Sequence, residues 1–107
     1  MKADLKAKWI EALRSGEYEQ CKDKLYSGNG YCCLGVLCVV SGAKFEQQDG
    51  EFVPYLEQEN IRNPDGNEFL CSDFAMKVGL SRQTQLADMN DNGASFSEIA
   101  DYIEKNL

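Results

Sequence analysis

Apolar residues recur at helical spacing near both ends of the chain. Within residues 3–15, one helical face carries four of them: Leu5, Trp9, Ala12 and Leu13. Gly16 follows as a natural helix stop. Near the other end, Ser95 and Glu98 have the spacing of a capping box. Five apolar residues then follow at helical spacing: Phe96, Ile99, Ala100, Ile103 and Leu107. These patterns predict one helix over residues 3–15 and another over residues 96–107, with Trp9 in the core.

The most apolar stretch of the chain is residues 31–40, with the sequence YCCLGVLCVV. Its composition fits either a buried strand or a buried helix. Its length, between Gly30 and Gly42, favours the helix. Gly35 inside this stretch costs about 1 kcal/mol of helix propensity relative to alanine. We therefore expect another part of the chain to approach closely at Gly35.

Residues 44–53 have the pattern of a β-hairpin. Two phenylalanines flank a polar stretch that ends in Asp49-Gly50, which is a strong hairpin turn signal. We expect Pro54 to end the second strand, because proline cannot donate a ladder hydrogen bond. Residues 57–68 are polar and contain a further turn signal, so we predict a loop there.

Two short helices are predicted between the hairpin and the last helix. The first covers residues 73–78, with Ser72 as its cap and Gly79 as its stop. The second covers residues 83–91. An Asn-Gly pair after it supplies a left-handed turn into the last helix, so these two helices form an αα-hairpin.

Together these elements predict a single compact domain over residues 1–107. The fold class is α+β, with four to five short helices packed with one small antiparallel β-hairpin. No apolar run approaches the roughly 20 residues of a membrane span, and the first residues do not have the pattern of a signal peptide. We therefore expect no membrane association and a cytoplasmic location.

The absence of histidine restricts the chemistry that the chain can perform. It excludes histidine-based acid–base catalysis, Ser-His and Cys-His triads, and metal sites that contain histidine. The five cysteines include no C-x-x-C pair, so we expect reduced and mostly buried thiols without zinc. Cys32 and Cys33, in the first turn of a helix, are the only candidate nucleophiles, and burial would raise their pKa. We expect a protein that is not an enzyme and that uses no cofactor.

The net charge of −7 is concentrated in one segment. Residues 46–73 carry eight acids and one base, whereas residues 1–45 carry seven bases and five acids. An acidic surface repels phosphates, so we expect no direct binding to nucleic acid. Any anionic ligand is expected within the first 45 residues.

A candidate ligand site lies in the loop before residues 31–40. A glycine-containing loop that opens a helix presents backbone N–H groups and the positive end of the helix dipole to an anion. Nearby lysines can neutralise phosphate, and a tyrosine can stack on a base. The spacing matches neither a P-loop nor a dinucleotide fingerprint, so a plain turn ahead of a buried helix is the alternative. The candidate ligand-binding residues are Arg14, Lys22, Lys24, Tyr26, Gly28, Asn29, Gly30 and Tyr31.

Three segments carry a resemblance to a known group of proteins. They read WIEALRSG at residues 9–16, GYCCLGVLC at residues 30–38 and MNDNGASFSEIA at residues 89–100. In this order they resemble small, uncharacterised proteins encoded by tailed phages and prophages. The resemblance implies a viral accessory protein that acts on host machinery in the bacterial cytoplasm. The resemblance does not identify any ligand-binding residue in this chain.

Two functional hypotheses follow. In the first, a phage-encoded, non-enzymatic accessory protein counters host defence by binding and sequestering a nucleotide-derived immune signal. A homo-oligomer is consistent with it, because such sites are often completed across a subunit interface. In the alternative, the chain is an acidic protein–protein inhibitor, or a DNA mimic, that covers a host defence enzyme through residues 46–73. An enzyme that uses Cys32 or Cys33 is a third and weaker hypothesis.

Overall fold

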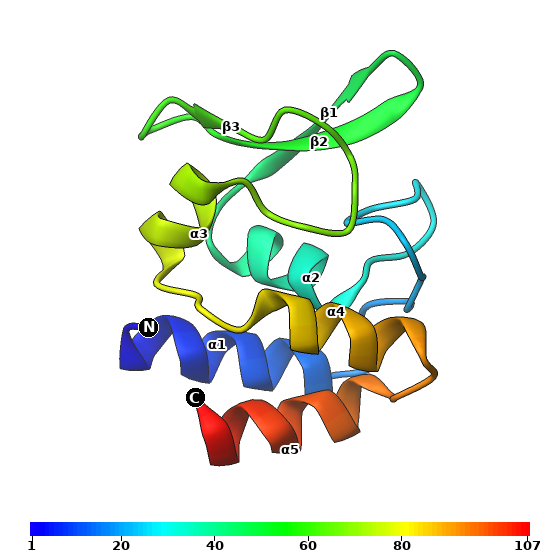
Figure 1. Cartoon of the computed structure of the whole chain (residues 1–107), viewed down its shortest axis with the longest axis vertical. Helices are drawn as coiled ribbons and strands as arrows, with labels where there is room; N and C mark the ends of the chain where they lie inside the picture. Colours follow the sequence, from blue (N-terminus) through cyan, green and yellow to red (C-terminus); the bar gives the residue numbers. More distant parts are fainter.

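A three-stranded antiparallel sheet lies over a group of five helices in the computed structural model, which describes residues 1–107 (Figure 1). The helices are α1 (Ala3–Arg14), α2 (Cys33–Val40), α3 (Ser72–Val78), α4 (Gln83–Asp91) and α5 (Phe96–Asn106). The strands are β1 (Lys44–Gln48), β2 (Glu51–Leu56) and β3 (Ile61–Arg62). The predicted α+β class is confirmed. None of the helices combines the length and apolar character that crossing a membrane requires.

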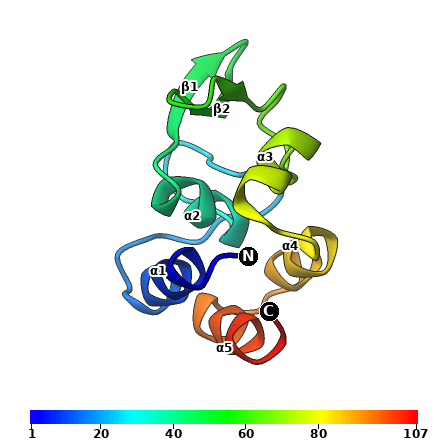
Figure 2. The same ribbon diagram turned by 90° about the vertical axis from the view of Figure 1, so that its left-hand side faces the viewer.

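Helix α2 lies between the sheet and helices α1 and α5, and most of its residues are buried (Figure 2). Helices α1 and α5 lie side by side and pack with α2 into one apolar cluster. Trp9 is fully buried there, and its indole Nε1 donates a hydrogen bond to the Cys33 carbonyl at 2.9 Å. The predicted core position of Trp9 is confirmed, and its one polar atom ties α1 to the start of α2.

Gly35 is the point at which the preceding loop approaches α2. A Cβ atom at this position would overlap the carbonyl oxygen of Leu25. The same carbonyl accepts a hydrogen bond from the backbone N–H of Cys32 at 3.3 Å. The close approach predicted at Gly35 is therefore confirmed, and it explains why a poor helix former stands in the middle of a buried helix.

The sheet contains the predicted hairpin, but its second strand is longer than the sequence indicates. Asp49 and Gly50 both have positive φ angles, 51° and 82°, as a type I′ turn requires. The prediction that Pro54 ends the strand is wrong. Pro54 lies opposite Phe45, and its carbonyl accepts from the N–H of Asn63 on the other side at 3.0 Å. The N–H and C=O of a strand residue point to the same side, so the N–H that proline lacks is not needed by β1.

Three local predictions need correction. Strand β3 lies within a stretch predicted to be loop. Helix α2 begins at Cys33 rather than two residues earlier, because Tyr31 forms bridges with Gln20 and Tyr26 instead of a helical turn. Helix α3 begins at Ser72, whose side chain makes no capping hydrogen bond. By contrast, the capping box at the start of α5 has both predicted hydrogen bonds.

Candidate functional site

Three of the predicted ligand residues, Tyr26, Gly28 and Tyr31, come together where the loop between α1 and α2 meets the sheet. The rings of Tyr26 and Tyr31 stack on one another, with centroids 4.5 Å apart. Phe45 and Phe52 pack against the ring of Tyr26 at 5.1 and 4.8 Å. Gly28 lies against the ring of Phe52, where a Cβ atom would be 3.1 Å from the nearest ring carbon. The faces of the tyrosine rings are therefore in contact with other aromatic side chains of the protein. These contacts hold the loop against the hairpin.

The backbone N–H groups of this loop also have partners within the chain. The hydroxyl of Ser27 accepts hydrogen bonds from the N–H groups of Asn29 and Gly30, at 3.3 and 3.0 Å. Lys22 and Lys24 are exposed and form no ion pair. The two exposed lysine side chains are thus the groups of this loop that remain free to bind an anion.

The start of α2 is closed by protein groups. The N–H of Cys33 donates to the side-chain oxygen of Asn90 at 3.2 Å. Asn90 is almost fully buried, and its amide also donates to the carbonyl of Cys21 and accepts from the side chain of Gln20, both at 2.8 Å. A side chain from α4 therefore occupies the helix end at which the sequence predicts an anion.

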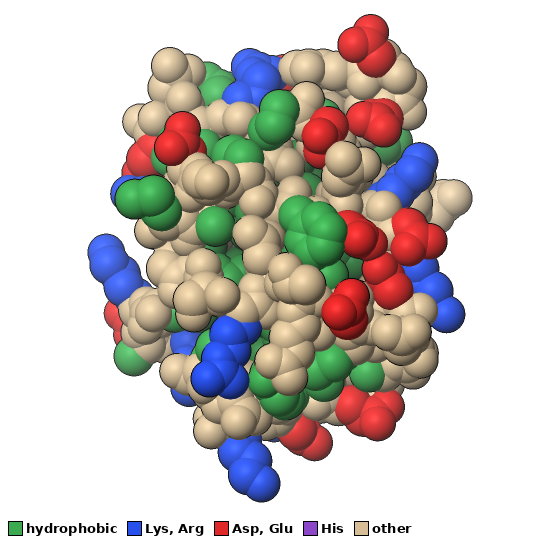
Figure 3. Space-filling model, viewed as in Figure 1, with side chains coloured by type: hydrophobic (Ala, Val, Ile, Leu, Met, Phe, Trp, Pro, Cys, Tyr) green, Lys and Arg blue, Asp and Glu red, His purple; other side chains and the backbone are tan.

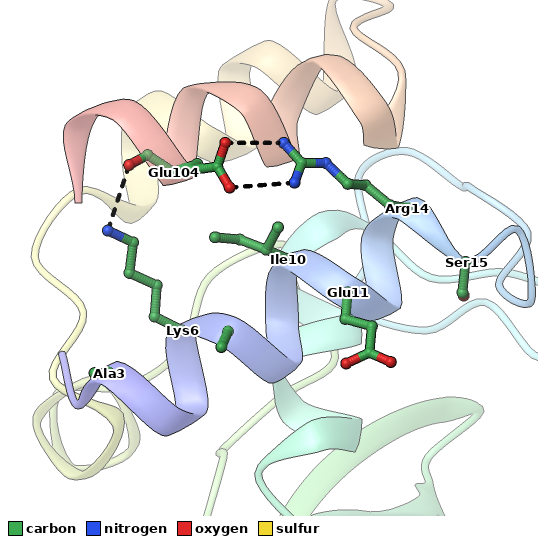
Figure 4. A pocket seen from close by; sticks show the side chains of 8 residues that line it. Ala3, Lys6, Ile10, Glu11, Arg14, Ser15 and Glu104 are labelled. Atoms are coloured by element: carbon green, nitrogen blue, oxygen red, sulfur yellow. Dashed lines mark hydrogen bonds and ion pairs between the residues drawn. The ribbon is translucent and has the colours of Figure 1, made fainter.

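Arg14 is bonded to α5 rather than to the loop. Its guanidinium lies 2.7 Å from the carboxylate of Asp101 and 3.3 Å from that of Glu104. Hydrogen bonds to Glu104 and Asp101 raise the pKa of Arg14, so the charge is permanent but paired. Lys6 reaches the backbone carbonyl of Glu104 at 3.5 Å (Figure 4).

These side chains border a shallow groove of about 710 Å³ on α1 (Figure 4). The groove is lined by Ala3, Lys6, Ala7, Ile10, Glu11, Arg14, Ser15 and Glu104. Its two bases are matched by two acids, so the lining carries no excess of either sign and has no preference for an anion.

The cysteines are all free thiols, and three of them are buried. Burial raises the pKa of Cys32 to about 12. Burial likewise raises the pKa of Cys33 well above its ordinary value. The prediction that burial would outweigh the helix start is confirmed, and neither thiol is poised as a nucleophile at neutral pH.

A group of acids that the sequence did not single out comes together on one side of the molecule. Carboxylate oxygens of Asp23, Glu68 and Asp91 lie within 4.8 Å of one another. They come from three segments: the loop after α1, the loop before α3 and the last turn of α4. The backbone N–H of Asp23 donates to the Asp91 carboxylate at 3.1 Å, which brings two of the segments together. Nothing in their sequence spacing indicates this, because chain folding alone makes them neighbours.

Glu68 is held in place by a buried asparagine at the start of its loop. The amide of Asn63 donates to the carbonyls of Asp65 and Phe69, both at 3.2 Å. Its oxygen accepts from the N–H of Cys71 at 2.7 Å. One side chain thus supplies the hydrogen bonds that regular structure would otherwise give to this segment.

The electrostatics of the group reflect the crowding of like charges. A hydrogen bond with Asp91, partial burial and the charges of Asp91, Asp23 and Asp88 raise the pKa of Glu68 to about 7. Burial acts to raise the pKa of Asp91, but hydrogen bonds from Glu68 and Asp23 lower it overall. Below pH about 7, Glu68 therefore carries a proton beside the ionised Asp91.

An exposed aromatic side chain stands beside these acids. Phe69 is 36% exposed, and it lines a hollow of about 380 Å³ together with Asp23, Asn67 and Glu68. Figure 3 shows acidic side chains gathered on the right-hand side of the view, with lysine or arginine side chains beside them. We call the surface formed by Asp23, Glu68, Phe69, Asp88 and Asp91 the acidic face.

The acids of the acidic face form no ion pair, whereas three other acids of residues 46–73 do. Within residues 46–73, Glu46 pairs with Arg62, Glu57 with Lys44 and Glu59 with Lys77. No ion pair reaches Asp23, Glu68, Asp88 or Asp91. Oxygen ligands of this kind suit hard cations, but Ca²⁺ takes six to eight of them, so three carboxylates do not define a metal centre.

Comparison with known proteins identifies a family but no activity. The whole chain, residues 1–107, matches the family described as "Domain of unknown function (DUF8296)", and the chain belongs to that family. No curated protein and no solved structure matches it.

Proposed function

We propose that this protein is a non-enzymatic binding protein that docks on a basic surface of a partner protein through the acidic face. The observation that carries the proposal is the convergence of three carboxylates from three segments, within 4.8 Å and without a cation among them. Holding like charges together is unfavourable, and lysine or arginine side chains of a partner would relieve it. Phe69 beside them would supply the apolar anchor, since aromatic residues are enriched in interface hot spots.

Two further observations support binding rather than catalysis. The chain has no histidine, and its two candidate nucleophiles have pKa values raised by burial. Glu68 and Asp91 are the two carboxyl groups with perturbed pKa values, and Glu68 borders an open hollow of the surface rather than a closed cleft. Catalytic pairs of carboxylates work in clefts that exclude water, which this surface does not provide.

The resemblance to tailed-phage proteins supports a partner in the infected bacterium. We infer that the protein counters host defence by covering the basic surface of a defence protein in the host cytoplasm. Basic surfaces of this kind commonly bind nucleic acid. An acidic protein that occupies one would compete with the nucleic acid for the same lysine and arginine side chains.

A matched pair of triple variants tests the proposal. D23N/E68Q/D91N replaces three acids of the acidic face, whereas E11Q/E17Q/D49N replaces three exposed acids elsewhere. Both are conservative in shape, and in a buffer of higher pH than the pKa of Glu68, which is about 7, each removes nearly the same charge. Immobilised wild-type protein and both variants are exposed to extracts of bacteria at low and at high salt. Retained proteins are identified by mass spectrometry, then purified and titrated against each variant.

The expected result is a protein retained by the wild type and by E11Q/E17Q/D49N at low salt. It is lost at high salt and is not retained by D23N/E68Q/D91N. If the acidic-face variant retains the same protein with unchanged affinity, or if the wild type retains none, docking through the acidic face is wrong.

Nucleotide sequestration by residues 22–31 is the competing proposal, and the two exposed lysines are what support it. It predicts that a cyclic dinucleotide or an ADP-ribose derivative raises the melting temperature of the wild type. It also predicts that K22A/K24A abolishes this stabilisation while leaving the melting temperature without ligand unchanged. Such a result, with D23N/E68Q/D91N behaving as the wild type, would favour a nucleotide ligand over a protein partner.

A further inference from the structure

Strand β1 is an edge of the sheet, because the strand order is β1-β2-β3. Figure 2 shows no other strand on the side of β1 that faces away from β2. An edge strand presents backbone N–H and C=O groups without partners. The register of the hairpin shows which residues carry these free groups.

The pair Gln48 and Glu51 closes the two-residue turn and is therefore a hydrogen-bonded pair. Hydrogen-bonded and non-hydrogen-bonded pairs alternate along an antiparallel ladder. Phe45 is thus in a non-hydrogen-bonded pair, and its partner is Pro54, which has no N–H to give. The backbone groups of Phe45 and Gln47 therefore point away from β2, and no hydrogen bond from another element reaches them.

The side chains of β1 alternate in a way that makes this edge complementary to itself. Lys44 and Glu46 lie on one face of the sheet, with opposite charges two residues apart. Phe45 points to the other face, where it packs against Tyr26. In an antiparallel pair of two such strands centred on Phe45, the Lys44 of each copy would lie directly opposite the Glu46 of the other.

The other registers that satisfy the free backbone groups are less favourable. A pair centred on Glu46 would place two glutamates opposite one another, and like charges directly opposite destabilise a sheet. A pair centred on Gln47 would leave Lys44 opposite the turn. Charge complementarity therefore selects the register centred on Phe45.

We propose that β1 is a self-association edge, through which two copies of this chain join their sheets into one antiparallel six-stranded sheet. Lys44 and Glu46 now pair with Glu57 and Arg62 at 3.6 and 3.0 Å, in exposed contacts that contribute little. Replacing these two ion pairs by ion pairs with the second copy therefore costs little free energy. The interface is one short strand on each side, well below the roughly 1,200 Å² of a stable standard interface. The dimer is therefore weak, and its population depends on protein concentration.

Two single charge reversals and their mixture test this proposal. In K44E both charged positions of β1 are acidic, and in E46K both are basic, so two copies of either variant repel one another across the edge. A mixed pair of the two variants has opposite charges at both contacts. K8E is the matched control, because Lys8 is exposed on α1 and the charge change is that of K44E.

Sedimentation equilibrium over a range of protein concentrations measures the association. The wild type and K8E are expected to dimerise alike. Each β1 variant alone is expected to dimerise at least about tenfold more weakly, and an equimolar mixture to regain the wild-type affinity. Circular dichroism of the separate variants shows that each is folded. A wild type that stays monomeric at all concentrations, or a mixture that stays monomeric, would overturn the proposal whatever the acidic face binds.

Discussion

Replacement of Asn90 by alanine tests how the long loop between α1 and α2 is held. Asn90 is almost fully buried, and its side chain makes three strong contacts across the molecule. It accepts from the N–H of Cys33 at 3.2 Å, donates to the carbonyl of Cys21 at 2.8 Å and accepts from the amide of Gln20 at 2.8 Å. Alanine removes all three partners at once and adds none.

The size of the effect follows from which groups lose their partner. Gln20 is exposed, so water replaces the lost contact at little cost. The N–H of Cys33 is buried and Cys21 is half-buried, so a donor and an acceptor remain unpaired. An unsatisfied buried polar group costs about 1–3 kcal/mol, so we expect a loss of about 2–4 kcal/mol in the free energy of unfolding. That is a large part of the 5–15 kcal/mol typical of a small domain.

Urea denaturation followed by tryptophan fluorescence measures this loss, because the single Trp9 is buried beside α2. The midpoint is expected to fall without a change in the slope of the transition. Asn92→Ala is the matched control, since the Asn92 amide donates to the carbonyl of Asp88 at 2.7 Å on the exposed surface. The control is expected to cost at most about 1 kcal/mol. If Asn90→Ala costs no more than the control, the loop is not held by this side chain.

Three further outcomes are expected. Gly35→Ala lowers the free energy of unfolding by at least about 1–3 kcal/mol, because its Cβ would overlap the carbonyl of Leu25; a urea midpoint equal to that of the wild type would refute the close approach. The pKa of Glu68 is raised from 4.5 to about 7 by its hydrogen bond with Asp91 and by like charges, so Glu68 binds its proton more tightly in the folded state than in the unfolded state. Its contribution is complete below pH 4.5 and is lost as the pH rises through about 7, so the melting temperature falls over this range in the wild type and less in E68Q. Burial raises the pKa of Cys32 to about 12, so mass spectrometry after treatment with a thiol reagent finds Cys32 unmodified in the folded protein; rapid labelling without urea would contradict this.

The elements that the sequence predicts well are those whose signals are local. The capping box of Ser95 and Glu98 sets the start of α5, and both of its hydrogen bonds are present. Asp49-Gly50 specifies the hairpin turn through positive φ angles that few other residue pairs adopt. These signals need no knowledge of the rest of the chain, because the residues that interact are at most three positions apart.

The errors arise where tertiary contacts outweigh local signals. Pro54 is a strand breaker by composition, yet the hairpin register places it where β1 requires no donor. Tyr31 continues an apolar helical stretch, yet its backbone bridges to Gln20 and Tyr26 hold it outside α2. The anion site stays a prediction, but nothing in the sequence indicates that the side chain of Asn90, from a distant segment, accepts a hydrogen bond from the N–H of Cys33 at the helix start.

The acidic face depends on the same two buried asparagines that hold the irregular segments. Asn90 directly precedes Asp91 and anchors the carbonyl of Cys21, two residues before Asp23. Asn63 bonds the backbone on both sides of Glu68. Two uncharged buried side chains thus force three carboxylates into proximity that their own repulsion opposes. Above the pKa of Glu68, which is about 7, the carboxylates repel one another, and this repulsion is what the proposed basic partner would relieve.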